Sequence, residues 1–262
     1  MGEELTAIRR RFGPEDLRPL LASTGVDRTL LVQTVSSLDE TREFLATAAA
    51  TDFIAGVVGW IDLTDPEIGE RLTQVREGPG GSFLVGIRHQ VHDEPDPSWL
   101  LRPAVQRGIR AVGDAGLVYD LLVRTRELPA ALDTVRWLPN VRFVLDHLAK
   151  PRIAAGPRDT AWESAMAPFA DCANVSIKLS GMVTEAAWGD WTLDDLRPYV
   201  QYAVEWFGPE RCLFGSDWPV CLLAATYDRV IDALRNCLDG VGEPDRDAVF
   251  GGNAVSLYRL AV

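Results

Sequence analysis

The amino-acid sequence predicts an α/β protein of the (β/α)8, TIM-type barrel class. Three observations support this prediction: short apolar runs recur along the chain, helical segments fill the gaps between them, and 262 residues are about the length of one such barrel. Runs rich in Val, Ile, Leu and Phe are typical of parallel strands whose two faces are both buried. Because no linker or low-complexity tract interrupts the alternation, we expect a single domain over residues 1–262.

Seven strands are expected from these runs. They are Thr29–Thr34, Phe53–Trp60, Phe83–His89, Leu117–Val123, Val141–Asp146, Val175–Leu179 and Arg211–Gly215. A closed barrel of this class needs eight strands, and only one helix, Pro14–Ser23, fits before the first run. We therefore expect a barrel that lacks its first strand, or an open sheet.

Three segments have the pattern of a helix start. Ser37–Glu40 and Thr64–Glu67 each place a hydroxyl side chain three residues before a glutamate, so that both side chains can satisfy free backbone N–H groups. Thr192–Asp195 is a weaker signal of the same kind. We expect helices to begin at all three places.

The composition excludes several functional classes. A net charge of −12 repels phosphate backbones, so no nucleic-acid partner is expected. No apolar stretch is long enough to span a membrane, and the polar segment Met1–Phe12 contains no secretory signal. The four cysteines form no C-x-x-C pair and are expected to be reduced thiols. These features predict a cytoplasmic protein.

Polar residues at the ends of the expected strands indicate the chemistry, because the C-terminal strand ends of a parallel barrel carry the reaction centre. They are Gln33, Trp60, Arg88, His89, Asp120, Asp146, His147, Lys178, Asp217 and Trp218. A carboxylate can take a proton from water, while imidazoles and a guanidinium can polarise a carbonyl or hold a substrate carboxylate. These residue types therefore predict an enzyme that hydrolyses a carbonyl derivative. A serine hydrolase is disfavoured because the sequence contains no G-x-S-x-G elbow. Catalysis by a cysteine nucleophile stays a minor alternative, because Cys221 lies close after Asp217.

Several of these residues also have a purely structural interpretation. His89 could be a satisfied structural histidine, and His92, in the polar loop that follows it, is expected at the rim. Trp60 and Trp218 could pack in the core or form a platform for substrate. Lys178, in an apolar strand, needs a partner, which could be a charge relay or a substrate carboxylate.

Four segments together resemble the signatures of a known family. They are Gly86–His89, Phe143–Pro151, Lys178–Gly181 and Phe214–Val220. These segments resemble the amidohydrolase-2 family of the amidohydrolase superfamily, and within it the branch of sugar lactonases such as L-fuconolactonase and L-rhamnonolactonase. The closing segment Val249–Ala254 is similar to the family's C-terminal helix entry, so the resemblance runs from about Phe12 to the end.

The resemblance implies a (β/α)8 barrel and hydrolysis of a sugar-acid lactone or a similar cyclic ester. It implies that Asp217 activates water and that His147 lies beside it as a metal ligand or a charge-stabilising group. Arg88 and His89 would contact the lactone, and Lys178 is a weaker candidate for substrate binding. The partner expected is therefore a small molecule, a sugar lactone.

One departure from the family pattern concerns the metal. Members of the family begin with a strand that ends in H-x-H, and this chain contains no H-x-H. Asp217 and His147 remain as metal ligands, which is too few for a catalytic zinc site with three protein ligands. We expect the true start to lie upstream of Met1, in a longer form that holds one divalent metal, zinc or a similar ion. The alternatives are catalysis without that metal and an inactive protein.

Two other functions stay open on the same barrel. A decarboxylase or another carbon–carbon lyase could use Arg88 to hold a substrate carboxylate. A homologue without the metal strand could bind a small molecule without turnover. An unclosed barrel also allows a homo-oligomer in which the open sheet edges are buried.

Overall fold

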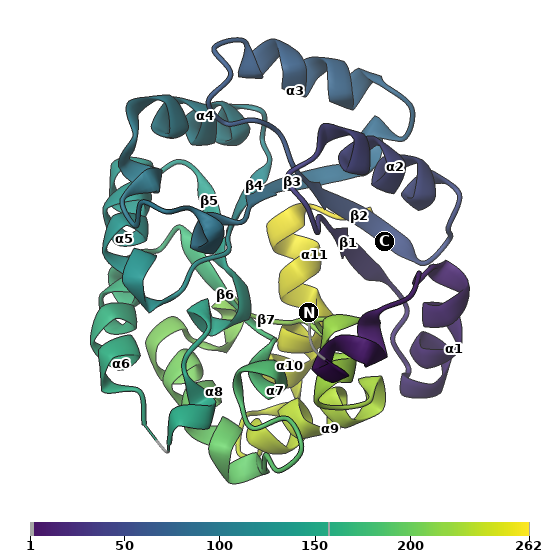
Figure 1. The fold of residues 1–262 in the computed structure, drawn as a ribbon, viewed down its shortest axis with the longest axis vertical. Coiled ribbons are helices and arrows are strands. Elements are labelled where there is room, and N and C mark those ends of the chain that lie inside the picture. Colours follow the sequence, from purple (N-terminus) through teal and green to yellow (C-terminus); the bar gives the residue numbers. More distant parts are fainter. Residues whose placement is uncertain (1–2, 157, 262) are drawn as a thin grey trace.

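In a computed structural model of the protein, residues 3–156 and 158–261 are described, and they contain one parallel sheet whose strands follow chain order. Its strands are β1 (Thr29–Val32), β2 (Ile54–Gly59), β3 (Leu84–His89), β4 (Val118–Leu121), β5 (Arg142–Leu145), β6 (Val175–Leu179) and β7 (Cys212–Phe214). Each strand pairs in parallel with the next, and the sheet curls like part of a barrel (Figure 1). All seven strands predicted from the sequence are confirmed, and β1 and β7 form the two edges.

Helices follow the strands and cover the outer side of the curled sheet (Figure 1). The longer ones are α1 (Pro14–Thr24), α2 (Leu38–Ala49), α3 (Ile68–Glu77), α4 (Pro103–Asp114), α5 (Leu128–Trp137), α6 (Thr160–Met166), α8 (Leu193–Phe207) and α9 (Tyr227–Cys237). The shorter helices are α7 (Met182–Glu185), α10 (Glu243–Asp247) and α11 (Asn253–Tyr258). Of these, α11 lies within the curl of the sheet and not on its outer side (Figure 1). Within the described part of the chain, no helix is long and apolar enough to cross a bilayer.

Two of the three predicted helix starts are confirmed and one is wrong. The Ser37 side chain accepts a hydrogen bond from the backbone N–H of Glu40, and Thr192 forms a reciprocal capping box with Asp195. Helix α3 begins at Ile68 instead of near Thr64. The Thr64 hydroxyl and its backbone N–H both donate to Asp62, so a local side-chain turn competes with the helix there.

The inner side of the sheet is built in two layers. The lower layer is apolar: Val58, Val118, Val144 and Leu213 pack around Tyr258 of α11. Because side chains alternate along a strand, the residue two positions further points to the same side. Those residues are Asp120 on β4 and Asp146 directly after β5, and both are fully buried. Charged side chains therefore form a second layer directly above the apolar one.

The outer side of the sheet packs against the helices, and Phe143 of β5 is one of its fully buried members. We expect Phe143→Ala to lower the free energy of unfolding by about 3–5 kcal/mol, because the change leaves a cavity in a packed core. Trp137, 67% exposed at the end of α5, is the matched control, and Trp137→Ala should change stability by less than about 0.5 kcal/mol. Denaturation in urea measures both, and equal losses would contradict this account of the core.

Candidate functional site

The centre of the site is a chain of four charged side chains inside the curled sheet. The Lys178 ammonium donates to Asp120 Oδ2 at 2.5 Å and lies 2.7 Å from Asp146 Oδ1, a close ion pair that is not aligned as a hydrogen bond. Arg88 Nη1 donates to the other oxygen of Asp146 at 2.8 Å. The two carboxylates are fully buried, and the two cations are 11% exposed. With all four ionised, the cluster carries no net charge.

Burial and neighbouring charges act in opposite directions on these groups. Burial raises the pKa of Asp120, against the opposing charge of Lys178. Burial also acts to raise the pKa of Asp146, but the charges of Lys178 and Arg88 outweigh it and leave that pKa below its ordinary value. Burial alone would lower the pKa of Lys178, yet its two carboxylate partners raise it. Lys178 is therefore an ammonium ion at neutral pH, held between two carboxyl groups.

Arg88 is held from a second direction by Gln33, which follows β1. Arg88 Nε donates to the Gln33 side-chain oxygen at 3.1 Å, and Nη2 donates to the Gln33 backbone oxygen. With the bond to Asp146, three of the five guanidinium N–H groups have protein partners. The other two N–H groups have no hydrogen-bond partner among the described residues, and such donors can polarise a carbonyl oxygen.

Beside this cluster lie His147, after β5, and Asp217, after β7. His147 Nε2 is 3.7 Å from Asp217 Oδ1, and His147 Nδ1 shares a hydrogen bond of 2.8 Å with the Ser180 hydroxyl. Gly181 makes room for the ring, because a Cβ at that position would lie 2.9 Å from the imidazole, and its φ of +65° also favours glycine. The pKa of His147 is lowered, mainly by burial and against the charge of Asp217, so the ring is neutral at neutral pH.

The backbone at both residues adopts a conformation that L-amino acids rarely take. Residues His147, Leu148, Ala149 and Lys150 have φ between 51° and 56°, and Asp217 has φ of 55°. Left-handed residues cost of order 1 kcal/mol each and persist where the surroundings hold them, often at functional sites. Here the turn carries the chain away from buried Asp146 and brings the His147 ring to Asp217.

The Asp217 carboxylate is open to a ligand. It is 15% exposed, and within the described part of the chain no hydrogen-bond donor contacts it. The Trp218 ring next to it stands edge-on to Phe12 at 5.2 Å between ring centroids, and its buried Nε1 has no partner among the described residues. Cys221 is unsuited to nucleophilic chemistry, because burial raises the pKa of its thiol to about 12.

His89 is placed apart from this cluster. Alternation along β3 sends Arg88 to the inner side and His89 away from it. There its ring stacks on Trp99 at 4.3 Å between ring centroids, Trp60 Nε1 donates to Nδ1 at 3.0 Å, and Nε2 lies 2.8 Å from a Glu94 carboxylate oxygen. The two imidazoles expected at the strand ends are therefore not brought together, and both His89 nitrogens already have protein partners.

Several residues of the site were not among the sequence candidates. Ser180 lies in the Lys178–Gly181 motif, so its position was visible although its contact with His147 was not. Glu94 gave no signal beyond its place in a polar loop. Glu185, on α7, pairs with Lys150 at 2.9 Å near the same strand ends.

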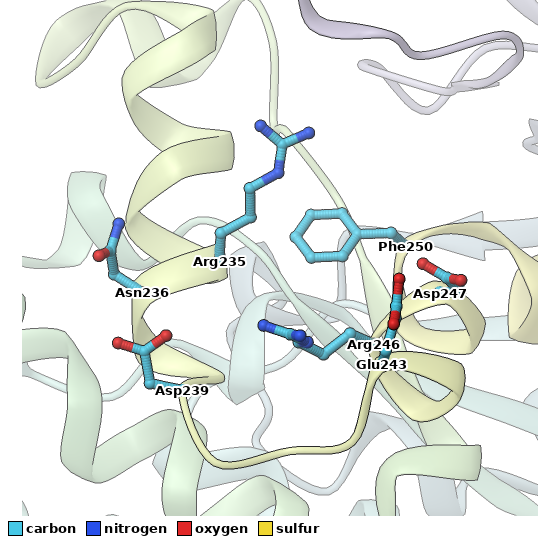
Figure 2. A pocket seen from close by; sticks show the side chains of 7 residues that line it. All are labelled: Arg235, Asn236, Asp239, Glu243, Arg246, Asp247 and Phe250. Carbon is cyan, nitrogen blue, oxygen red and sulfur yellow. The ribbon is translucent and has the colours of Figure 1, made fainter.

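A cavity elsewhere in the molecule has a volume of about 310 Å³ and lies between the end of α9 and α10 (Figure 2). It is lined by Arg235, Asn236, Asp239, Glu243, Arg246, Asp247 and Phe250. Because α9 runs back from the C-terminal ends of the strands, its last turn lies toward their N-terminal ends. None of the strand-end residues lines this cavity.

Two possible metal ligands lie together at this site. His147 Nε2 and Asp217 Oδ1 lie close enough to share one ion, at 3.7 Å from each other. A catalytic zinc site uses three protein ligands, and the described residues contain no group of three His, Cys, Asp or Glu side chains that could hold a metal. The described residues therefore do not fit such a site.

Comparisons with known proteins agree with one another. A model of the amidohydrolase family matches residues 2–260. An L-fucono-1,5-lactonase of Burkholderia ambifaria is 41% identical over 262 residues, covering 98% of this chain and 89% of the relative. An L-fucono-1,5-lactonase of Burkholderia multivorans is 37% identical, covering 99% and 90%. A crystal structure of an amidohydrolase from Burkholderia multivorans with bound zinc superposes with a TM-score of 0.94 at 35% identity, covering 99% and 93%.

Lys178, which both buried carboxylates contact, is expected to contribute strongly to the stability of the fold. Lys178→Met should lower the free energy of unfolding by about 3–5 kcal/mol at neutral pH, because it leaves two buried carboxylates without their shared cation. Arg42→Met removes the cation of an exposed ion pair with Asp39 and should change stability by less than about 1 kcal/mol. Urea denaturation compares them, and a Lys178→Met protein as stable as the parent would refute the pairing.

Proposed function

The chain belongs to the amidohydrolase family, and we propose that it hydrolyses the ring ester of a sugar-acid lactone, with Asp217 as the base that activates water. The observation that carries this proposal is an open carboxylate, Asp217, next to a neutral imidazole, His147, and beside a guanidinium that has two N–H groups to spare. The relatives named L-fucono-1,5-lactonase support the substrate class.

The proposed reaction needs no group besides water and the side chains of Asp217, Arg88 and His147. Asp217 takes a proton from water while the water oxygen bonds to the lactone carbonyl carbon. The remaining N–H groups of Arg88 stabilise the negative charge that forms on the carbonyl oxygen. The ring C–O bond then breaks, the leaving oxygen takes the proton from Asp217, and the product is a hydroxy acid. His147, held by Ser180, orients the water and Asp217 through its Nε2.

Charge balance supports an ester substrate over the decarboxylase alternative. A decarboxylase of this kind would need a free cation for the substrate carboxylate, whereas Arg88 and Lys178 are each matched by a buried carboxylate. A neutral lactone can enter without leaving an unpaired buried charge. On this proposal His89 supports Trp60 at the rim of the site, because neither of its nitrogens is free to transfer a proton.

The first test is the role of Asp217. Asp217→Asn should lower kcat for aldonolactone hydrolysis by about 10²–10⁴-fold, because the amide cannot accept a proton from water. A pH indicator follows the acid released. Asp39→Asn, at an exposed residue of α2, is the control and should keep full activity. Wild-type protein that opens no sugar lactone, or Asp217→Asn with undiminished kcat, would refute the proposal.

The second test is substrate charge. We expect kcat/KM for a neutral aldonolactone to exceed that for the matching aldaric acid monolactone, in which the terminal CH2OH is a carboxylate, by at least about tenfold. The reason is that an extra anion would be repelled by Asp217, while Arg88 and Lys178 are already paired with buried carboxylates. Competition between the two lactones in one assay gives the ratio directly, and equal values would show that an unmatched cation is available.

A further inference from the structure

Helix α11, near the C-terminus, lies within the curl of the sheet (Figure 1). Its residue Tyr258 belongs to the buried apolar layer on the inner side of the sheet. The Tyr258 ring is 3% exposed and packs in the apolar layer beneath the charged cluster. Its hydroxyl lies 2.9 Å from each carboxylate oxygen of Asp120, to which it donates. This hydrogen bond joins Tyr258 to Asp120, which lies 138 positions earlier in the sequence, inside the curled sheet.

The position of α11 is fixed at both of its ends. The Asn253 side chain donates to the backbone oxygens of Pro209 and Cys212, at 2.8 and 2.7 Å, at the start of β7. Arg142, at the start of β5, donates to the backbone oxygen of Leu257. The Tyr258 hydroxyl is therefore held at a set place relative to the strands that carry the site.

We propose that Tyr258 is a positioning residue for the reaction: its hydroxyl holds Asp120 in place and, through Lys178 and Asp146, sets the position of the Arg88 guanidinium. This inference rests on the proposed function, since it concerns the same site. The contacts form one continuous chain from Tyr258 to Arg88, with steps of 2.9, 2.5, 2.7 and 2.8 Å.

The hydroxyl has a specific electrostatic role in this chain. Asp120 is fully buried, and its only two donors among the described residues are Tyr258 and Lys178. Hydrogen bonds to the charged form lower the pKa of a buried carboxyl and so favour its ionised state. Without the hydroxyl, Asp120 would more readily take a proton, and Lys178 would be left with Asp146 as its one charged partner. Lys178 would then compete with Arg88 for that carboxylate, and Arg88 would move.

A double-mutant cycle separates this role from packing. Tyr258→Phe keeps the ring and should lower kcat for lactone hydrolysis about tenfold, the effect of losing one hydrogen bond to a charged group. In an Asp120→Asn protein, which has no charge to hold, the same change should cost less than about twofold. Tyr119→Phe is the control, because Tyr119 is also a fully buried tyrosine and its hydroxyl has no partner among the described residues. It should leave kcat unchanged.

A second measurement needs no turnover. The Nε–H NMR signal of Arg88, assigned from an Arg88→Lys sample, should shift in Tyr258→Phe and stay in place in Tyr119→Phe. Equal losses of kcat from Tyr258→Phe in both backgrounds, or an unmoved Arg88 signal, would overturn the inference. A wild-type protein that opens no lactone would refute the proposed function instead, and the NMR comparison would then decide the role of Tyr258 alone.

Discussion

The balance of four buried charges is the constraint on which the rest of this site depends. Two carboxylates and two cations occupy one layer inside a curled parallel sheet, and each carboxylate contacts at least one cation within 2.8 Å. Burying such a group without a partner is costly, whereas a matched set with good geometry is tolerated. The arrangement holds Arg88 by hydrogen bonds, keeps Lys178 charged, and pairs both of these cations with buried carboxylates.

The neighbouring candidate site, formed by His147 and Asp217, lies where the strands end. The turn after β5 and the residue Asp217 after β7 both use left-handed backbone, which ordinary side chains adopt only when the surroundings hold them there. Buried Asp146 anchors the start of the first turn, and Ser180 holds the His147 ring at its far side. The result is a carboxylate that accepts no hydrogen bond from the described residues beside a neutral imidazole, an arrangement suited to activating water.

The chain belongs to the amidohydrolase family. A similar protein from Burkholderia multivorans was solved with bound zinc, while the described residues of this chain offer two donors for a metal, His147 and Asp217. The charged layer and the Asp217–His147 pair are formed by this chain's own residues. The chemistry we propose is correspondingly that of a general base and a polarised carbonyl.

Much of this fold was determined by local sequence alone. Apolar runs identified all seven strands, because burial on both faces leaves an apolar pattern within each run. The C-terminal ends of parallel strands also lie on the same side of the sheet. Polar residues at those ends, Arg88, Asp146, His147, Lys178 and Asp217, were therefore visible. Only the tertiary structure decided which of them touch. It separated His89 from Arg88 on opposite sides of one strand, paired His147 with Ser180, and brought Tyr258 to Asp120 from 138 residues away. These contacts depend on strand register and on the path of α11, which are set by packing between distant segments and leave no pattern in any one of them.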